Sequence, residues 1–380
     1  MRQLTGIIGS GNVGIDPFHP HSWSGISRRF FSECQRRGML NRAFGVEVSF
    51  PVKSWYALKN YSPDRRRWTS QYYSDPGYRT ALTRLIGRQL RESDYDSDFF
   101  QLGAMYDVPS LARGRTSCYS YNDGNFSMSC RSPHFPKGIT ASAVDRTLRF
   151  EREVNSGLDL IFTMSEYLRR SFISDYGMEP GKVITLGAGI NIDELPIPVP
   201  DKDYSNGSLL FIGVDFVRKG GLDLVNAFRI VREKVPHATL HIVGPRERIT
   251  AVPELPGIVW HGFFDKNVPE HMVKLRRLLD DASLFVMPSL YEPFGIAPLE
   301  AMAHEIPCVV SNAWALPEIV PDDVCGRLVQ PGKWEELADV TIELLKDPSL
   351  LERFGKSGRK HVEQFYTWEK VVDRLQDVLG

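Results

Sequence analysis

Two glutamates eight positions apart, set between two apolar segments, constrain this chain most strongly. The stretch Glu292-Pro-Phe-Gly-Ile-Ala-Pro-Leu-Glu300 follows an apolar run over residues 282–288 and precedes another over 306–310. Short apolar runs of this kind predict buried strands of a parallel sheet, joined here through a loop and a helix. Ligands of such sheets bind beyond the carboxyl ends of the strands, where this loop is expected to lie. The predicted fold class is therefore α/β.

The residue types in this stretch suit a ligand that carries hydroxyl groups. Pro293 and Gly295 keep the loop out of a helix, so that backbone N–H groups can turn toward a ligand. Glu292 would stand at the start of the loop and Glu300 one or two turns into the helix. Carboxylates accept hydrogen bonds, and paired hydroxyls of a sugar or ribose donate them. A capped helix with two solvated glutamates is the alternative reading.

The stretch resembles the E-x7-E motif of retaining glycosyltransferases with the GT-B fold, especially glycosyltransferase family 4 (group 1). Leu209-Leu-Phe-Ile-Gly213 and the following Val-Asp-Phe-Val-Arg-Lys-Gly-Gly221 resemble the phosphate-binding segment of that family. Leu240-His-Ile-Val-Gly-Pro245 resembles its next strand and glycine turn, and Ala315-Leu-Pro-Glu-Ile-Val320 resembles its G-x-P-E-I-V. The similarity is strong from residue 155 onward and weak before it.

The resemblance implies two Rossmann-like domains facing a central cleft, with a nucleotide diphosphate sugar as donor and neither a metal nor another cofactor. Residues 1–192 would form the acceptor-side domain and residues 207–364 the donor-binding domain. Residues 193–206, with three prolines, would be the linker between them. A last helix, about residues 365–380, would cross back onto the first domain.

The resemblance also implies a role for individual residues. Glu300 would hydrogen-bond the donor ribose, Glu292 would contact the donor sugar, and Lys219 would neutralise the departing diphosphate. The backbone at Phe294, Gly295 and Ile296 would contact sugar hydroxyls or phosphate. Gly213, Gly244 and Pro245 complete the expected donor-binding set.

One departure concerns the charge at the phosphate. Many members of the family have Arg directly after the first glycine of the phosphate segment, where this chain has Val214. We hypothesise that Arg218, next to Lys219, replaces that charge. Without a metal, fixed cations must stabilise the negative charge that grows on the leaving oxygens. A solvated surface pair is the competing reading of Arg218 and Lys219.

A second motif, near the N-terminus, points to a different ligand. Gly9-Ser-Gly-Asn-Val-Gly14 matches the G-x-G-x-x-G pattern of dinucleotide-binding proteins. That pattern requires a helix to open inside it, whereas Pro17 and Pro20 follow here and the first convincing helix starts near Ser24. No acidic residue ends the next expected strand, residues 46–50. An NAD site is therefore not favoured.

The first half of the chain offers candidates for the cleft and the acceptor. Gly11, Gly14, Trp23 and Gly25 lie in the first strand-to-helix loop, which lines the cleft in the resembling family. Residues 116–123 read as a strand that ends in Asn122 and Asp123, where many members have His or His-Asp. Asp123 could orient an acceptor hydroxyl or accept its proton, although Asn-Asp-Gly is also a common turn.

Residues 51–100 are dense in Tyr, Trp and Arg and are interpreted as an acceptor-binding insertion. The net charge of −1 gives no reason to expect a nucleic acid partner. The first half leans basic by about five charges, nearly all Arg. That bias suits an anionic acceptor or a peripheral membrane contact, and solvated arginines are the plainer alternative.

Location follows from what the sequence lacks. The five cysteines form no C-x-x-C pair, which favours a reducing compartment and no zinc site. No signal peptide and no apolar run of about eighteen residues is evident. We expect a cytoplasmic protein, with any membrane contact peripheral and at the inner face.

Together these features predict a retaining glycosyltransferase of the hexosyltransferase type. It would move a hexosyl unit from a UDP- or GDP-linked sugar to an acceptor hydroxyl of a glycan, a lipid-linked glycan or a small molecule. The alternatives are a non-catalytic sugar-nucleotide-binding GT-B protein and an NAD-dependent oxidoreductase that uses Gly9–Gly14.

Overall fold

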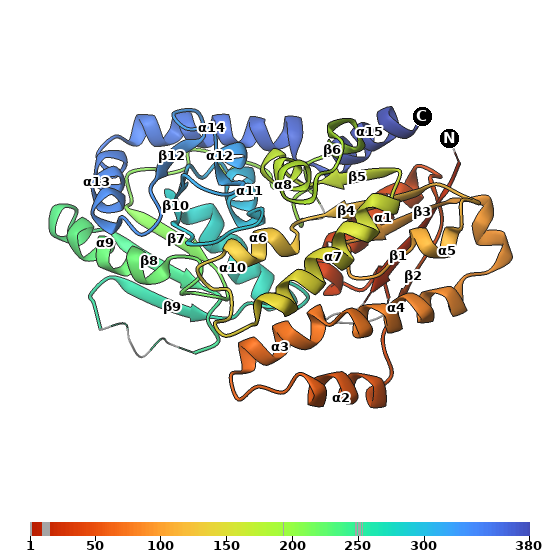
Figure 1. The fold of residues 1–380 in the computed structure, drawn as a ribbon. Coiled ribbons are helices and arrows are strands. Elements are labelled where there is room, and N and C mark those ends of the chain that lie inside the picture. Colours follow the sequence, from red (N-terminus) through yellow and green to blue (C-terminus); the bar gives the residue numbers. More distant parts are fainter. Residues whose placement is uncertain (1, 10–15, 193, 248, 250–251, 253) are drawn as a thin grey trace. The chain divides into compact units, whose positions relative to one another are not determined.

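The chain divides into two compact units, each built on one parallel sheet. The computed structural model describes residues 2–9, 16–192, 194–247, 249, 252 and 254–380. The first unit comprises residues 1–189 and 368–380, and the second comprises residues 190–367. Each contains a six-stranded sheet whose paired strands are parallel, with helices on both faces (Figure 1). The predicted α/β class with two Rossmann-like sheets is confirmed.

The first unit has the strand order β2-β1-β3-β4-β5-β6. Its elements in chain order are β1 (Leu4–Gly9), η1 (Ser22–Gly25), α1 (Ile26–Arg36), β2 (Leu40–Val46), α2 (Phe50–Lys59), α3 (Arg65–Ser74), α4 (Pro76–Gln89), η2 (Glu92–Asp96), β3 (Asp98–Leu102), α5 (Pro109–Ala112), β4 (Cys118–Asn122), α6 (Phe126–Arg131), α7 (Ala141–Gly157), β5 (Leu160–Thr163), α8 (Glu166–Tyr176), η3 (Pro180–Lys182), β6 (Val183–Thr185) and α15 (Trp368–Leu379).

The central strands β1, β3 and β4 are buried on both faces of this sheet. Because side chains alternate along a strand, the neighbours Phe99 and Phe100 of β3 face opposite sides. Phe99 belongs to the core cluster that includes residues of α4 and α8. Phe100 stacks on Phe30 of α1 at 5.0 Å between ring centroids. Phe30 in turn packs against Trp368, so α15 closes the same face although it lies at the end of the sequence.

Two expectations near the start of the chain are wrong in detail. The strand expected at residues 46–50 is β2, which ends at Val46, and Phe50 already begins α2. Pro51 lies in the first turn of that helix, where its missing N–H costs nothing. The helix expected from Ser24 begins at Ile26, because Trp23 and Ser24 have φ angles of 45° and 57°.

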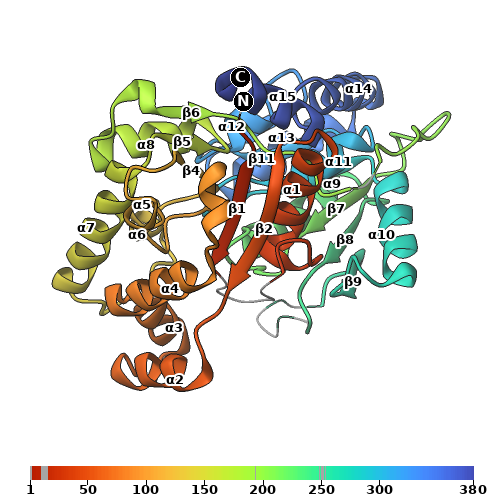
Figure 2. The same cartoon turned by 90° about the vertical axis from the view of Figure 1, so that its right-hand side faces the viewer.

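The second unit has the strand order β12-β11-β10-β7-β8-β9. Its elements are β7 (Ser208–Ile212), α9 (Gly221–Lys234), β8 (Thr239–Val243), β9 (Ile258–Gly262), α10 (Pro269–Asp281), β10 (Leu284–Met287), α11 (Ile296–Ala303), β11 (Cys308–Ser311), α12 (Leu316–Ile319), β12 (Gly326–Val329), α13 (Trp334–Leu345) and α14 (Pro348–Phe365). Figure 2 shows the same elements after a quarter turn. The chain leaves β7 toward β8 on one side and returns to β10 on the other, so β7 and β10 flank the topological switch point.

The proline-rich stretch that the sequence marks as a linker makes contacts inside the second unit. Lys202 donates from Nζ to the carbonyls of Leu279 (3.1 Å) and Asp280 (2.9 Å). The Tyr204 hydroxyl donates to the carbonyl of Glu305 at 2.8 Å. These bonds tie the stretch to the amino-terminal side of β10 and to the end of α11. Among the described helices, none combines the length and the apolar character needed to cross a membrane.

Candidate functional site

The switch point of the second unit brings together the residues that the sequence singles out. Arg218 and Lys219 lie in the loop after β7, and Glu292 lies in the loop after β10. β7 and β10 are neighbouring parallel strands, so both loops leave the same edge of the sheet. Seventy-three residues separate Lys219 from Glu292 along the chain, and the Lys219 Nζ lies 2.7 Å from the Glu292 Oε2. A cation and a carboxylate are thus fixed together at the edge where ligands of such sheets bind.

The two glutamates are not solvated surface groups. Glu292 is 7% exposed and Glu300 is 5% exposed, which excludes the reading of a capped helix with two free carboxylates. Each instead has a cationic partner: Glu292 pairs with Lys219, and Glu300 pairs with Lys266. Burying a carboxylate is costly unless it is paired, so these two contacts offset the cost of burying both side chains at this edge of the sheet.

Arg218 holds the two loops together as well as carrying charge. Its Nη1 donates to the Tyr291 carbonyl at 2.8 Å and lies 4.0 Å from the Glu292 Oε2. Its own carbonyl accepts from the N–H of Leu290 at 2.9 Å. The Arg218 Nε lies 3.5 Å from the Asp215 Oδ2, and this ion pair orients the guanidinium from the other side. Arg218 therefore lies beside the pair of Lys219 and Glu292, while Val214 points into solvent with 60% of its surface exposed.

Two glycines explain why the phosphate segment needs its sequence. Gly220 has φ 74°, and a Cβ on it would lie 1.9 Å from the carbonyl oxygen of Pro288. Gly213 lies beneath the lysine, since a Cβ there would lie 2.4 Å from the Lys219 Cδ. Only glycine permits both the left-handed turn and these close approaches. The strand, the glycine and the Lys-Gly pair thus work together to aim Lys219 at the loop after β10.

The helix after the loop contributes backbone groups and Glu300. Gly295 is the N-cap of α11, and Ile296 is its first residue. The N–H groups of a first helical turn have no helical acceptor and carry partial positive charge. Phe294 is buried at 5% exposure, with its ring 6.4 Å from Tyr366. The segment around Gly295 can therefore offer N–H donors to an anionic or hydroxylated ligand from a fixed position.

Gly244 and Pro245 follow β8 at the same edge of the sheet. The Gly244 N–H donates to the Gly262 carbonyl at 2.9 Å, which joins this turn to the end of β9. Next to it, His261 and His241 share a 2.9 Å contact between ring nitrogens. Burial lowers the pKa of both imidazoles, and in His261 the neighbouring His241 lowers it further. Both rings are consequently neutral near pH 7.

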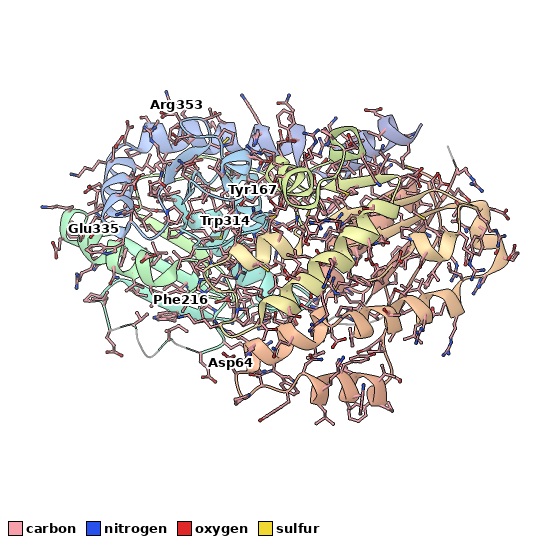
Figure 3. The ribbon with its side chains drawn as sticks, viewed as in Figure 1. Asp64, Tyr167, Phe216, Trp314, Glu335 and Arg353 are labelled. Atoms are coloured by element: carbon pink, nitrogen blue, oxygen red, sulfur yellow. The ribbon has the colours of Figure 1, made fainter. Side chains whose placement is uncertain are left out.

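Sequence reasoning missed two residues of this edge, Lys266 and Trp314. Lys266 follows β9 and pairs with Glu300, although 34 positions separate them. Trp314, labelled in Figure 3, lies between β11 and α12. It packs edge-to-face on Tyr291 with 4.9 Å between ring centroids. Trp314 adopts φ 61°, a region that bulky residues rarely occupy. The one available signal was Trp314's place just before the stretch that resembles G-x-P-E-I-V, whereas nothing local marks Lys266.

In the first unit, the structure places the candidate acceptor residues at the carboxyl ends of its strands. Asn122 ends β4 and is buried, and its Nδ2 donates to the Ser120 hydroxyl (2.9 Å) and the Phe162 carbonyl (3.2 Å). Its Oδ1 is buried without a hydrogen-bond partner among the described residues. Asp123 follows directly and is half-buried.

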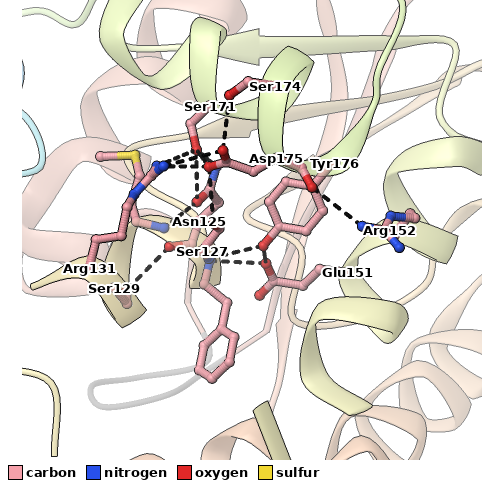
Figure 4. A network of polar contacts seen from close by, with 12 residues as sticks. Asn125, Ser127, Ser129, Arg131, Glu151, Arg152, Ser171, Ser174, Asp175 and Tyr176 are labelled. Carbon is pink, nitrogen blue, oxygen red and sulfur yellow. Dashed lines mark hydrogen bonds and ion pairs between the residues drawn. The ribbon is translucent and has the colours of Figure 1, made fainter. Parts of the chain in front are cut away.

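The loop after Asp123 is anchored by a buried polar network (Figure 4). Asn125 caps α6 by accepting from the Met128 N–H at 2.8 Å, and its Nδ2 donates to the Ser171 hydroxyl of α8. Glu151 of α7 accepts from the Phe126 N–H (3.0 Å) and the Tyr176 hydroxyl (2.6 Å). Arg79 neutralises Glu151 at 3.0 Å. Three helices therefore fix the backbone that follows Asp123.

The first strand-to-helix loop is only partly described. Gly11 and Gly14 lie outside the described residues. Trp23 packs edge-on against Tyr121 at 5.9 Å, and Gly25, with φ 86°, caps the start of α1. Helix α1 begins at Ile26, well beyond Gly14, whereas a dinucleotide fingerprint requires its helix to begin inside the glycine pattern. A pocket of ≈ 460 Å³ at the end of β2 is lined by Glu47, Ser49, Phe50, Lys53 and Gln89, among others.

Within the part of the chain that the structure describes, no group of three or more His, Cys, Asp or Glu side chains is arranged to hold a metal ion. The cations at the switch point are the side chains of Arg218, Lys219 and Lys266.

Comparison with known proteins agrees with this geometry. Residues 200–361 match the family model of glycosyl transferases group 1. The chain is 29% identical over 235 residues to an MMP alpha-(1->4)-mannosyltransferase of Mycolicibacterium hassiacum, an alignment that covers 59% of this chain and 54% of the relative. Alignments to the first four curated relatives cover between 29% and 64% of their length.

Two solved structures share the fold over the whole chain. A sucrose-phosphate synthase from Thermosynechococcus elongatus superposes with a TM-score of 0.69 at 17% identity, covering 100% of this chain and 98% of its own. Anabaena HepE in complex with UDP-glucose gives a TM-score of 0.68 at 16% identity, with 100% and 99% covered. The chain therefore has the GT-B fold, and its second unit is a domain of the group 1 glycosyltransferase family.

Proposed function

We propose that this protein is a retaining glycosyltransferase that moves a hexosyl unit from a UDP- or GDP-linked sugar to an acceptor hydroxyl. The second unit would bind the donor and the first unit the acceptor. The observation that carries the proposal is the cluster of Arg218, Lys219 and Glu292 at the switch point between β7 and β10. The UDP-glucose bound to HepE supports a nucleotide-sugar donor, and the name of the Mycolicibacterium relative, a mannosyltransferase, supports transfer of a hexosyl unit.

The cluster suits the electrostatics of diphosphate departure. Breaking the bond between the sugar and the diphosphate places negative charge on the leaving oxygen. Lys219 has three N–H donors, of which one meets the Glu292 carboxylate and another the weak acceptor Met287 Sδ at 3.6 Å, and Arg218 lies beside it. Fixed donors of this kind stabilise developing charge without having to reorganise during the reaction. The reaction would then need no metal.

The glutamates would position the donor. Glu292 lies at the start of the loop and would accept from hydroxyls of the sugar, while Glu300, one turn into α11, would accept from the ribose. Neither carboxylate is free, since Lys219 and Lys266 hold them in place. We favour a front-side displacement in which the departing phosphate assists the acceptor hydroxyl. Asp123 of the first unit would orient that hydroxyl.

Ligand-dependent melting tests the proposal, because a ligand that binds only the native state raises the melting temperature. The panel contains UDP, GDP, their hexose conjugates, inorganic diphosphate and NAD. We expect a shift with one nucleotide diphosphate. Glu300→Ala should weaken that shift and leave the smaller shift with inorganic diphosphate unchanged, whereas the exposed Glu270→Ala should change neither.

Turnover separates the proposal from its two rivals. A non-catalytic sugar-nucleotide-binding protein would show the nucleotide shift but release no nucleotide diphosphate with any acceptor. An oxidoreductase would respond to NAD alone, and the central claim would then be wrong. The anomeric configuration of the product, read by NMR, tests retention: an inverted product would contradict the front-side displacement.

A further inference from the structure

Helix α2 of the first unit carries apolar side chains on two sides. Toward the interior, Val52 and Tyr56 pack against the core, with the Tyr56 ring 5.9 Å from that of Tyr78. Toward the outside, Phe50, Trp55 and Leu58 are 82%, 66% and 72% exposed, and Tyr61 just beyond the helix is 67% exposed. We call these four exposed residues the α2 face. A helix that only covers a core would carry polar groups there.

The α2 face is held firmly rather than frayed. The Trp68 Nε1 of α3 donates to the Ala57 carbonyl at 2.6 Å, and the Trp68 ring packs on Tyr61 at 6.0 Å. In both views α2 lies beyond α3 and α4, on the side away from β1 and β2 (Figures 1 and 2). A helix that is held in place by α3 therefore presents these side chains outward. Exposing so much apolar surface to water is unfavourable, and such patches mark interaction surfaces.

Positive charge surrounds this face. Between residues 50 and 67 the chain has five Lys or Arg residues and one acid, Asp64. Lys53 and Lys59 have partners in Glu47 (3.4 Å) and Asp75 (2.9 Å). Arg65 and Arg66 are exposed at the start of α3, and no ion pair to either is found among the described residues. Asp64 caps the N–H groups of Arg66 and Arg67 (Figure 3).

We propose that the α2 face docks this protein on an anionic lipid surface. Phe, Trp, Leu and Tyr would enter the boundary between headgroups and acyl chains, while Arg65, Arg66 and the two lysines would lie at the anionic headgroups. Aromatic residues beside Lys and Arg are typical of helices that lie in a membrane interface. Aromatic residues and Arg also occur at protein interfaces, whereas lysine is depleted there, so Lys53 and Lys59 beside the α2 face favour the lipid surface as its occupant. The docking does not depend on the proposed transfer activity.

Flotation of the whole chain with vesicles tests the proposal. One set contains phosphatidylcholine alone, and the other also contains phosphatidylglycerol. We expect the chain to float with the anionic vesicles, to float poorly with the neutral ones, and to be released by salt because exposed charges are screened. Trp55→Ser combined with Leu58→Ser should lower the partition coefficient about tenfold or more. Arg65→Gln with Arg66→Gln should have a similar effect on anionic vesicles only.

A matched control has equally exposed apolar residues in the second unit. Ile197 and Val273 are 79% and 53% exposed, and Ile197→Ser with Val273→Ser should leave flotation unchanged. All variants should keep their melting temperature and their shift with nucleotide diphosphate, because the substituted side chains are on the surface. Loss of flotation with that shift retained supports docking even if no transfer activity is ever detected.

Three outcomes would overturn the proposal. One is equal flotation of the wild type and the Trp55, Leu58 variant. Another is equal partition of the wild type onto neutral and anionic vesicles. The third is concentration-dependent self-association of the wild type that the same variant abolishes, since the α2 face would then be covered by a second copy of the chain.

Discussion

The switch point of the second unit is built from paired charges, whereas that of the first unit is built from shape. Between β7 and β10, Lys219 and Glu292 pair at 2.7 Å. Between β1 and β3, the described part of the first loop instead offers Trp23 in a left-handed conformation, packed on Tyr121. A diphosphate is the same in every donor and needs fixed cations. Acceptors differ from one enzyme to another. Their recognition depends on the shape of a binding surface, which particular residue types do not reveal in a sequence.

The largest expected effect comes from removing the lysine of the second unit. Lys219→Ala should lower kcat by about 10²–10³, because it deletes a fixed donor to the leaving group. Glu292→Gln should cost about 10² or more. Steady-state release of nucleotide diphosphate at saturating donor measures both effects.

The pair also predicts how these two losses combine. Lys219→Ala leaves a buried carboxylate with only Arg218 near it, so part of the effect could be a loss of stability. In Lys219→Ala with Glu292→Gln that charge is gone, and the melting temperature should recover while the rate stays low. The exposed Lys274→Ala is the control. Normal turnover in the double variant would contradict the claim that the paired charges of the second unit are needed for transfer.

A smaller effect is expected in the first unit. Asp123→Asn should lower transfer to the acceptor by about 10², because the acceptor hydroxyl loses the carboxylate proposed to orient it. Binding of the nucleotide diphosphate should not change, since the donor residues lie in the other unit. Calorimetry with the nucleotide and a transfer assay separate the two quantities. If Asp123→Asn instead weakens nucleotide binding and spares transfer, the assignment of acceptor and donor to separate units is wrong.

Stability tests whether the loop after β7 is as rigid as its contacts indicate. Gly220→Ala places a Cβ against the Pro288 carbonyl and should cost about 2 kcal/mol or more, lowering Tm by about 4–8 °C. Gly332→Ala is the matched control: its φ of 76° is similar, but nothing lies within 4 Å of the added Cβ. It should cost only about 1 kcal/mol. Equal losses of stability in the two variants would mean that the Pro288 carbonyl yields to the added Cβ and that the loop is less rigid than its contacts indicate.

The smallest effect concerns pH and distinguishes the units. Burial lowers the pKa of His241, His261, His304 and His361, all in the second unit. A histidine with a lowered folded pKa takes up protons more readily when unfolded, so its contribution to stability is present above about pH 6.5 and is lost on acidification below it.

Five carboxyls of the first unit, Glu33, Asp75, Asp94, Asp175 and Asp373, have lowered pKa values because of partners that outweigh burial. Their contribution is lost only at more acidic pH, through and below the ordinary carboxyl range. Hydrogen exchange followed from pH 7 to 5 should therefore show the second unit losing protection first. Earlier loss in the first unit would contradict the assignment.

The sequence by itself marked the residues that lie at the switch point between β7 and β10 of the second unit. The glutamates, the Lys-Gly pair and the apolar strands are local signals, because each depends on residue types within about ten positions. Gly220 is required by a left-handed turn, and Gly213 is required by the side chain of Lys219, which lies against it. Both requirements can be recognised from the sequence pattern. The same locality predicted α/β class and parallel sheets, from short apolar runs alternating with helices.

Only the tertiary structure decided which groups meet. Lys266 finds Glu300 across 34 positions, and Arg79 finds Glu151 across 72, through strand order that no local window contains. The strand expected at 46–50 failed because Ser49 and Pro51 start a helix whose stability depends on packing against α3 and α4. The exposure of Phe50, Trp55 and Leu58 was equally hidden, since burial depends on what the rest of the chain places against a helix, and here it covers one side alone.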